Sequence, residues 1–194
     1  YSMSKIEPIK GWHKYTSFMN SFSNEKHRDM LNNMRHHLKY ECLKDPEIFN
    51  TLVPNPEYRF YGGFDNAHIR GMKDVKAFYY DIWDSDSSLV ELDIHHCSVG
   101  DWGVACDGEW YQQIPGELLI EQGSNDLDPN AYYLSHAHLS WLFPFREVHG
   151  SMLLEGEICY LDEKGSTLTT LEKLDVALLE EVKAAYPLIC LLYT

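Results

Sequence analysis

The spacing of apolar residues changes once along the chain, from a helical period to a strand period. Between about residues 25 and 82, apolar side chains recur every three or four positions, which is typical of helices with one buried face. Ser23 or Asn24 can cap the first of these helices. The pattern predicts helices over residues 25–43 and 45–52, and a third that follows Gly71 and places Met72, Val75, Phe78, Tyr79 and Ile82 on one face.

From Val90 onwards, apolar and polar residues alternate, which is typical of strands with one buried face. Turns at Gly100-Asp101 and His149-Gly150, and a loop-like stretch over residues 115–130, separate the alternating segments. The predicted strands are a short one over 58–61, ended by Gly62-Gly63, one that begins at Val90, and three over 104–113, 132–145 and 152–161. Helices segregated from an antiparallel sheet predict an α+β fold.

The two ends of the chain are predicted to lie outside the main domain. Residues 1–22 show little periodicity and are expected to form an extended N-terminal arm. Thr169 and Glu172 have the spacing of a capping box, which predicts a C-terminal helix that continues to Pro187. The expected division is therefore an arm over 1–22, a domain over 23–165, and a helix and tail over 166–194.

Charge and composition argue against several kinds of binding partner. The formal net charge is −14, so neither nucleic acid nor an anionic membrane surface is an expected partner. No apolar run reaches the roughly 20 residues that span a bilayer. The five cysteines are scattered without a CxxC pair, which favours reduced thiols and a cytoplasmic location.

The first predicted helix carries polar residues on its apolar face. On a helical wheel, His37 lies beside Met30, and Glu41 lies between Met30 and Met34. Burying a charge without a partner costs several kcal/mol. Either the imidazole and carboxylate satisfy each other, or they face a cavity, or the stripe ends in solvent at this point.

Histidines and glutamates also occur along the predicted strands. His96 is in phase with the apolar residues that begin at Val90. A two-residue turn at His149-Gly150 would pair Leu142 with Glu157 and Ser140 with Cys159. That register places His136 and His138 on one face with Glu155 and Glu157, whereas a one-residue bulge would reverse it.

Metal and cofactor chemistry are not expected from the motifs. His136-x-His138 could present two metal ligands, but no glutamate follows at the short spacing that such strand sites use. There is no glycine-rich phosphate loop, no dinucleotide fingerprint and no G-x-S-x-G motif. Proton transfer by histidine and glutamate, without a metal or cofactor, is the chemistry that remains.

Three stretches of the chain resemble the SnoaL-like proteins of the nuclear-transport-factor-2-like superfamily. They are the segment from His37 through Asp45 to Pro56-Glu57-Tyr58, the helix 71–79, and the closing strand 157–162. The resemblance covers roughly residues 25–165. It implies a curved antiparallel sheet wrapped around helices as a cone, with a deep apolar pocket and often a dimer. The family includes polyketide cyclases, isomerases, dehydratases, epoxide hydrolases, aldol-type lyases and non-enzymatic binding modules.

The family's functional positions match this chain only in part. Its pocket-facing site on the first helix corresponds to His37 and Glu41. The isomerase base position falls near Tyr61-Gly62, where no carboxylate is present. The dehydratase histidine position falls near Ser87-Ser88. The pocket face of the last strands would carry His136, His138, Glu155 or Glu157.

These observations favour a cofactor-independent lyase, acting by dehydration or retro-aldol-type cleavage on a small aromatic or polycyclic molecule. His37 and Glu41 are the expected base and orienting partner, and His138 with Glu157 the expected proton donor or oxyanion stabiliser. A homodimer or homotrimer is expected. The alternatives are a non-catalytic binding module, an epoxide-type hydrolase, or an isomerase or cyclase. The expected substrate contacts are Tyr40, Tyr61, His96, Trp110 and His136.

Overall fold

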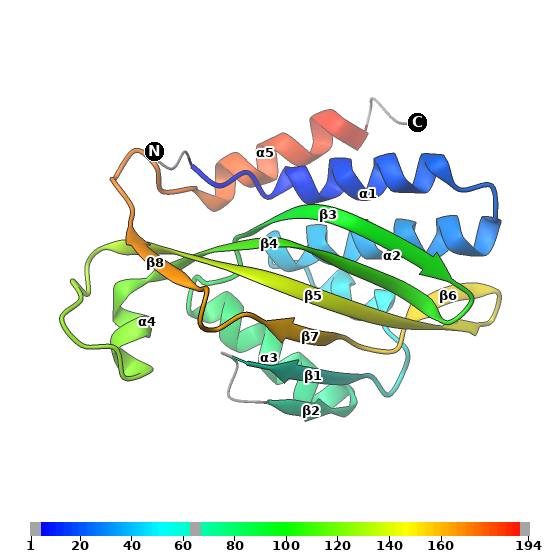
Figure 1. Cartoon of the computed structure of the whole chain (residues 1–194), viewed down its shortest axis with the longest axis horizontal. Coiled ribbons are helices and arrows are strands. Elements are labelled where there is room, and N and C mark those ends of the chain that lie inside the picture. Colours follow the sequence, from blue (N-terminus) through cyan, green and yellow to red (C-terminus); the bar gives the residue numbers. More distant parts are fainter. Residues whose placement is uncertain (1–4, 63–66, 191–194) are drawn as a thin grey trace.

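The architecture is one layer of helices packed on one face of a curved, mixed sheet (Figure 1). This computed structural model describes residues 5–62 and 67–190. The helices are α1 (Ile9–Ser21), α2 (Glu25–Cys42), the 3-10 helix η1 (Pro46–Thr51), α3 (Gly71–Asp84), α4 (Gly116–Glu121) and α5 (Leu179–Cys190). The strands are β1 (Glu57–Tyr61), β2 (His68–Arg70), β3 (Val90–Gly100), β4 (Gly103–Pro115), β5 (Tyr132–Val148), β6 (Ser151–Leu154), β7 (Ile158–Leu161) and β8 (Thr167–Thr170).

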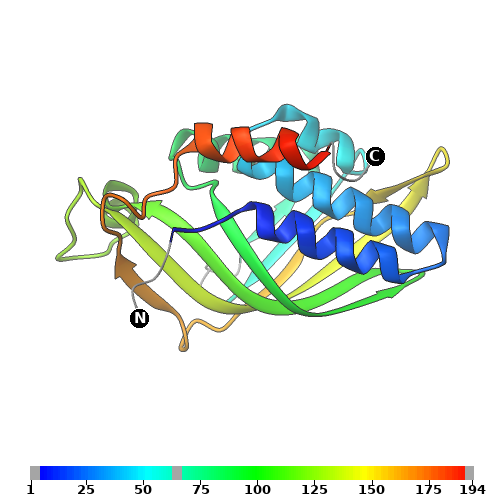
Figure 2. The ribbon, with the colours of Figure 1, turned by 90° about the horizontal axis from the view of Figure 1, so that it is seen from above.

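The sheet runs in the order β2-β1-β7-β5-β4-β3, and β6 and β8 pair with other parts of the long strand β5. Neighbouring strands are antiparallel, except that β1 and β7 are parallel. Figure 2 shows the bend of the sheet, with α1, α2 and α5 on one side of it. The predicted α+β fold with a curved sheet around helices is confirmed, although the sheet is mixed and does not close.

Helix α2 is the central element of the core. The side-chain oxygen of Asn24 accepts hydrogen bonds from the backbone amides of Lys26 and His27, which caps the start of the helix as predicted. Its buried stripe consists of Met30, Leu31, Met34, His37, Leu38 and Cys42. One polar residue, His37, therefore lies among residues that the sheet covers.

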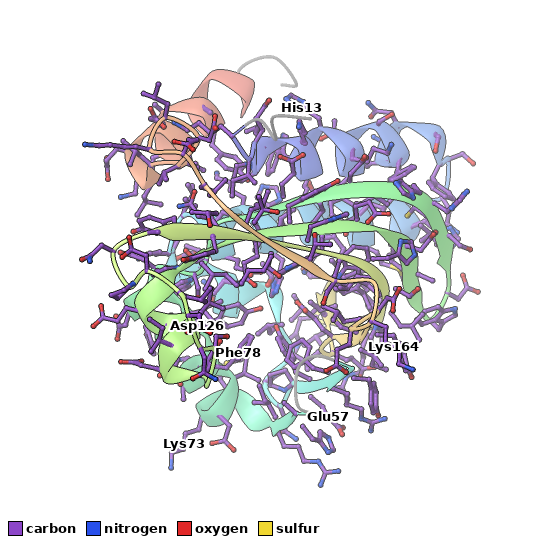
Figure 3. The ribbon with its side chains drawn as sticks, turned by 60° about the vertical axis from the view of Figure 1, so that its left-hand side comes forward. His13, Glu57, Lys73, Phe78, Asp126 and Lys164 are labelled. Carbon is purple, nitrogen blue, oxygen red and sulfur yellow. The ribbon has the colours of Figure 1, made fainter. Side chains whose placement is uncertain are left out.

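Helix α3 closes the lower part of the same layer. Tyr58 on β1 packs edge-on against Phe78 and Tyr79 of this helix. Figure 3 shows Phe78 on the inner side, whereas Lys73, a little more than one turn earlier, points away from the molecule. The helical spacing that predicted α3 therefore corresponds to a real buried face.

The prediction of an extended arm over residues 1–22 is wrong for the part that the structure describes. Ile9–Ser21 forms α1, which packs against α2 and β3. Trp12 and Tyr15 are buried, and a Cβ at Gly11 would lie 2.4 Å from Leu38 Cδ2. Glycine permits this close helix crossing. The helical spacing of Trp12, Tyr15 and Met19 is the signal that could have revealed the helix.

The C-terminal helix begins later than predicted. Thr167–Thr170 is strand β8, which pairs with Tyr133–His136 of β5, so Thr169 and Glu172 do not form a capping box. Helix α5 begins only at Leu179. Three threonines in four residues favour extended backbone, and the edge of β5 is available to pair with this segment. The loop predicted over residues 115–130 contains the short helix α4.

The predicted hairpin register holds for β6 and is wrong for β7. Val148 pairs with Ser151 and Phe145 with Leu154, as a two-residue turn requires. Beyond that point Trp141 pairs with Cys159 and Leu142 with Ile158, one residue out of step. The extra residue lies at Glu155–Glu157, where Gly156 adopts a φ of 143°. This bulge turns Glu157 to the face opposite the one predicted.

Within the described residues, no helix is both long enough and apolar enough to cross a bilayer.

Candidate functional site

A buried polar cluster joins α2 to the bulge before β7. The His37 side chain is 2% exposed, and its Nε2 lies 3.1 Å from Glu157 Oε1. The same nitrogen lies 2.8 Å from the hydroxyl of Tyr79, and that hydroxyl lies 2.9 Å from the hydroxyl of Tyr58. On the other side of the ring, Nδ1 lies 2.6 Å from Thr51 Oγ1. Four elements, α2, η1, α3 and β1, therefore bring polar groups to the bulge.

The hydrogen bonds of Thr51 show that Nδ1 of His37 carries a proton. Thr51 donates its hydroxyl hydrogen to the carbonyl oxygen of Ile48, at 2.5 Å. A hydroxyl has only one hydrogen, so Nδ1 of His37 must donate to Thr51 Oγ1. Nε2 and the Glu157 carboxyl then need one proton between them, because an unprotonated nitrogen and a carboxylate would repel each other. The contact between Nε2 and Glu157 is thus a place inside the fold where one proton can be shared.

Glu41 lies close to this pair but does not bond to His37, whose partners are Thr51, Tyr79, Tyr58 and Glu157. Burial raises the pKa of Glu41 well above its usual value, and the charge of Glu157 raises it further. A carboxyl in this environment tends to keep its proton. The expectation that His37 and Glu41 satisfy each other is therefore replaced by a His37–Glu157 pair with Glu41 as a neutral neighbour.

The two tyrosines at the cluster are proton donors rather than phenolates. Burial raises the pKa of both Tyr58 and Tyr79 well above 10, and the charge of Glu157 contributes to each shift. Cys159 lies on the same side, with Sγ 3.9 Å from Glu157 Oε2. Burial likewise raises the pKa of this thiol, so a reactive thiolate is not favoured.

The strand histidines face the opposite side of the sheet from this cluster. His136 and His138 bond to Glu109 of β4, at 2.8 and 3.2 Å, and not to Glu157. Glu157 leaves the face that was predicted to combine it with His136, His138 and Glu155, because the bulge at Gly156 shifts the register by one residue. His96 is also on this outer face, 84% exposed beside Asp107. A bulge between Ile94 and His96 puts it out of phase with the buried side chains.

Burial acts to raise the pKa of Glu109 on this outer face. Hydrogen bonds from His136 and His138 outweigh that effect and lower the pKa below its usual range. Glu109 is therefore an ionised carboxylate between two imidazoles.

The remaining expected substrate contacts are dispersed. Tyr61 is 36% exposed and stacks on Tyr160 at the outer end of β1 and β7. Trp110 packs against the core on the inner face, where it pairs with Leu92 and Ala137 on the neighbouring strands. Tyr40 lies beside His36, on another face of α2 from His37. Of these residues, Trp110 is the one on the same face of the sheet as Glu157.

Sequence reasoning missed Thr51, Tyr58 and Tyr79. Tyr79 was counted as part of an apolar stripe, and Tyr58 as part of a short strand. A hydroxyl at the end of such a buried ring usually has a partner. That requirement, together with an unpartnered histidine on α2, is the signal that could have linked them.

Two surface grooves lie away from the cluster. The larger, about 530 Å³, lies between the end of α3, α4 and residues 129–132, and its lining includes the acidic residues Asp84, Asp86, Glu117 and Glu121. The smaller, about 210 Å³, lies between Asn55, Glu57, Arg59 and Glu155. Neither includes His37, Glu41 or Glu157 in its lining. Within the pair, Glu157 is the more exposed member, with its side chain 15% exposed against 2% for His37.

Comparison with known proteins identifies the fold class. No sequence model of a protein family matches the chain, and no curated protein matches it. A proposed polyketide cyclase from Xanthomonas campestris superposes with a TM-score of 0.54 at 13% identity, over 72% of this chain and 95% of that one. A proposed SnoaL-like polyketide cyclase from Shewanella putrefaciens gives 0.52 at 10% identity, over 84% and 92%.

A proposed aromatic ring hydroxylase from Novosphingobium aromaticivorans gives a TM-score of 0.51 at 6% identity, over 78% of this chain and 96% of that one. The chain therefore has the fold of the SnoaL-like proteins, as its sequence resemblance implied. At these identities the likeness is one of fold, so activity has to be argued from the cluster itself.

Proposed function

We propose that this protein is a cofactor-independent acid–base enzyme, a lyase that dehydrates or cleaves a small aromatic or polycyclic molecule. The observation that carries the proposal is the hydrogen-bonded pair of His37 and Glu157 in the interior, at 3.1 Å. An isolated buried charge is costly, and an apolar pair would fill this space more simply. A retained interior proton is what acid–base catalysis requires.

The two members of the pair have different access. His37 is 2% exposed, whereas the Glu157 side chain is 15% exposed. Glu157 is therefore the group that would meet a substrate, as the general base. His37 is a positioning residue that orients the carboxylate and exchanges its proton.

Glu41 supplies the complementary acid. Its pKa is raised by burial and by the charge of Glu157. Glu41 therefore keeps a proton that it can donate, whereas Glu157 is the carboxylate that accepts one. In a dehydration, Glu157 would remove the proton next to a carbonyl, and Glu41 would protonate the departing hydroxyl. Water leaves, a carbon–carbon double bond forms, and no oxidant or metal is consumed.

The test is proton exchange, because it does not require the natural substrate. A panel of aryl ketones and aromatic β-hydroxyketones would be incubated with the protein in D₂O, and deuterium uptake next to the carbonyl followed by NMR. We expect Glu157→Gln to lose about 10²–10⁴-fold of the catalysed rate. The matched control is Glu155→Gln. Glu155 is two residues before Glu157, and its exposed carboxylate pairs with Arg146.

Uptake no faster than in buffer across the panel, or equal rates in Glu157→Gln and the wild-type protein, would contradict the proposal. Aryl epoxides incubated in ¹⁸O-labelled water separate a lyase from an epoxide-type hydrolase, because only the hydrolase opens the epoxide with water and places labelled oxygen in a diol.

A binding module without chemistry is the second candidate, favoured by one observation. Both ring nitrogens of His37 already have partners inside the protein. On that view the cluster is a structural network, and aromatic ligands would bind equally well to the wild-type protein and to Glu157→Gln without any exchange.

A further inference from the structure

The outer face of the sheet carries histidines on two of its strands beside carboxylates. A bulge between Ile94 and His96 puts both His95 and His96 on the solvent side of β3. A Cβ at Gly108 would lie 2.2 Å from the carbonyl oxygen of Asp93, so glycine is required where β4 meets the bulge. On the neighbouring strands, Glu109 pairs with His138 in register.

Three of these side chains converge. One ligand atom each from His95, Glu109 and His138 lies within 4.8 Å of the other two. The rings of His95 and His138 are 6.2 Å apart, and His138 Nδ1 lies 3.2 Å from Glu109 Oε1. From this convergence we propose that His95, Glu109 and His138 form a zinc-type transition-metal site on the outer face of the sheet.

Only small side-chain rotations are needed to close the site. Ligand atoms around tetrahedral zinc are about 3.4 Å apart, given bonds of about 2.1 Å. The side chains of His95 and His138 are 41% and 43% exposed, so both rings are free to turn. Two imidazoles and one carboxylate suit Zn²⁺, Ni²⁺ or Cu²⁺, whereas Mg²⁺ and Ca²⁺ prefer oxygen ligands.

Neighbouring polar groups lie beside two of the three ligands, His138 and Glu109. Nε2 of His138, on the side away from Glu109, lies 3.8 Å from Asp107 Oδ2. His136 Nε2 lies 2.8 Å from the second carboxylate oxygen of Glu109. A carboxylate behind a ligating histidine, and a hydrogen bond to a ligating carboxylate, are the outer contacts of protein metal sites. Three protein ligands leave a fourth position for water or another ligand.

The sequence did not suggest this site because its ligands come from three strands. The expectation against metal rested on the absence of a glutamate shortly after His138. Here β4 supplies Glu109 across the ladder, and the β3 bulge supplies His95, and neither can be read from spacing along one strand. The site is on the opposite face of the sheet from His37 and Glu157, so it is independent of the proposed proton transfer.

The test is calorimetric titration of the metal-stripped full chain with ZnCl₂ in excess MgCl₂, which occupies exposed acidic surface. We expect saturable binding of one Zn²⁺ per chain. His95→Ala, His138→Ala and Glu109→Gln should each weaken it by at least about 100-fold, the upper limit of the 10-fold to 100-fold typical of a lost outer contact. Co²⁺ in place of Zn²⁺ should give the visible absorption of a tetrahedral site, which all three variants should lose.

His96→Ala is the matched control, because His96 adjoins His95 and is 84% exposed on the same face. It should weaken Zn²⁺ binding by about 10-fold at most, because His96 reaches the site only through Asp107. Unfolding curves should show that all four variants are folded. The proposal is overturned if the wild-type protein shows no saturable binding in MgCl₂, or if His96→Ala weakens binding as much as the three ligand variants.

Discussion

Thr51 determines which nitrogen of the buried His37 ring carries a proton. Its hydroxyl donates to Ile48 and therefore accepts from Nδ1, at 2.6 Å. The arrangement leaves Nε2 directed at Glu157 and Tyr79. One threonine thus selects the nitrogen that takes part in any proton transfer.

Replacing Thr51 by valine should destabilise the protein by about 1–3 kcal/mol, because a buried Nδ1–H then has no acceptor. Urea unfolding measures this change. Thr51→Ser is the matched control, since it keeps the hydroxyl and removes one methyl group, worth about 0.8 kcal/mol. If the valine variant is as stable as the serine variant, the hydrogen bond assigned to Nδ1 is wrong.

The raised pKa of Glu41 predicts how the stability of the protein depends on pH. Its pKa in the folded protein is raised above the ordinary 4.5, so the folded state holds a proton that the unfolded state releases. Its contribution to stability is present at low pH and is lost as the pH rises from about 4.5 to the folded value. Glu41→Gln does not titrate, so its stability relative to the wild-type protein should increase with pH. The gain is about 1.4 kcal/mol for each unit of pKa shift.

Urea unfolding of both proteins at several pH values between 4.5 and 8 measures that difference. A difference that is constant, or that falls as the pH rises, would mean that Glu41 is not held neutral by its surroundings.

At the scale of elements, the decisive feature is the bulge between β6 and β7. Three steps along β5, from Leu142 to Phe145, face four steps along the returning chain, from Leu154 to Ile158. Gly156 makes this possible, because a Cβ there would lie 1.8 Å from the carbonyl oxygen of Glu57. The bulge carries Glu157 to the inner face, where His37 is.

Gly156→Ala should therefore cost about 3 kcal/mol or more, since both its φ of 143° and the neighbouring backbone exclude a side chain. Gly150→Ala is the matched control: its φ is also positive, at 83°, but nothing lies within 4 Å of the added Cβ. We expect this control to lose about 1–2 kcal/mol in urea unfolding. Equal losses would show that the bulge is not sterically required.

The same elements show what the sequence could and could not predict. Helical spacing located α2 and α3, and strand alternation located β3, β4 and β5, because an element that buries one face has apolar residues at regular intervals in its sequence. His37 and Glu157 were both candidates, but the partner expected for each was wrong. The single residue inserted at Gly156 changes the face and leaves no periodic signal, and the bulge in β3 moves His96 in the same way. Strand β8 forms because the edge of β5 is free to pair with it, and the sequence of residues 167–170 does not show that this edge is free.

At the scale of the whole molecule, the N-terminal helix is part of the main core. Trp12 is 3% exposed, and the guanidinium carbon of Arg35 lies 4.6 Å from the centroid of its ring. Helix α1 covers α2 and β3 from the same side as α5, as Figure 2 shows. The division into an arm and a separate domain that the sequence suggested does not describe this packing.

Trp12→Ala should reduce the free energy of unfolding by about 3–5 kcal/mol, the usual cost of removing a buried aromatic side chain. Ser17→Ala, on the exposed side of the same helix, should change it by no more than about 0.5 kcal/mol. Chemical denaturation followed by tryptophan fluorescence and by circular dichroism should give one shared transition. A Trp12→Ala variant as stable as the wild-type protein would mean that α1 is not docked.

The proposed acid–base chemistry depends on one proton shared by His37 and Glu157 inside the fold. Nitrogen-15 NMR of histidine-labelled protein measures it directly, in the wild type, in Glu157→Gln and in the control Glu155→Gln. We predict that Nδ1 of His37 carries a proton in all three, and that the Nε2 resonance moves in Glu157→Gln alone. An unprotonated Nδ1, or an Nε2 resonance that is the same in all three proteins, would contradict the account.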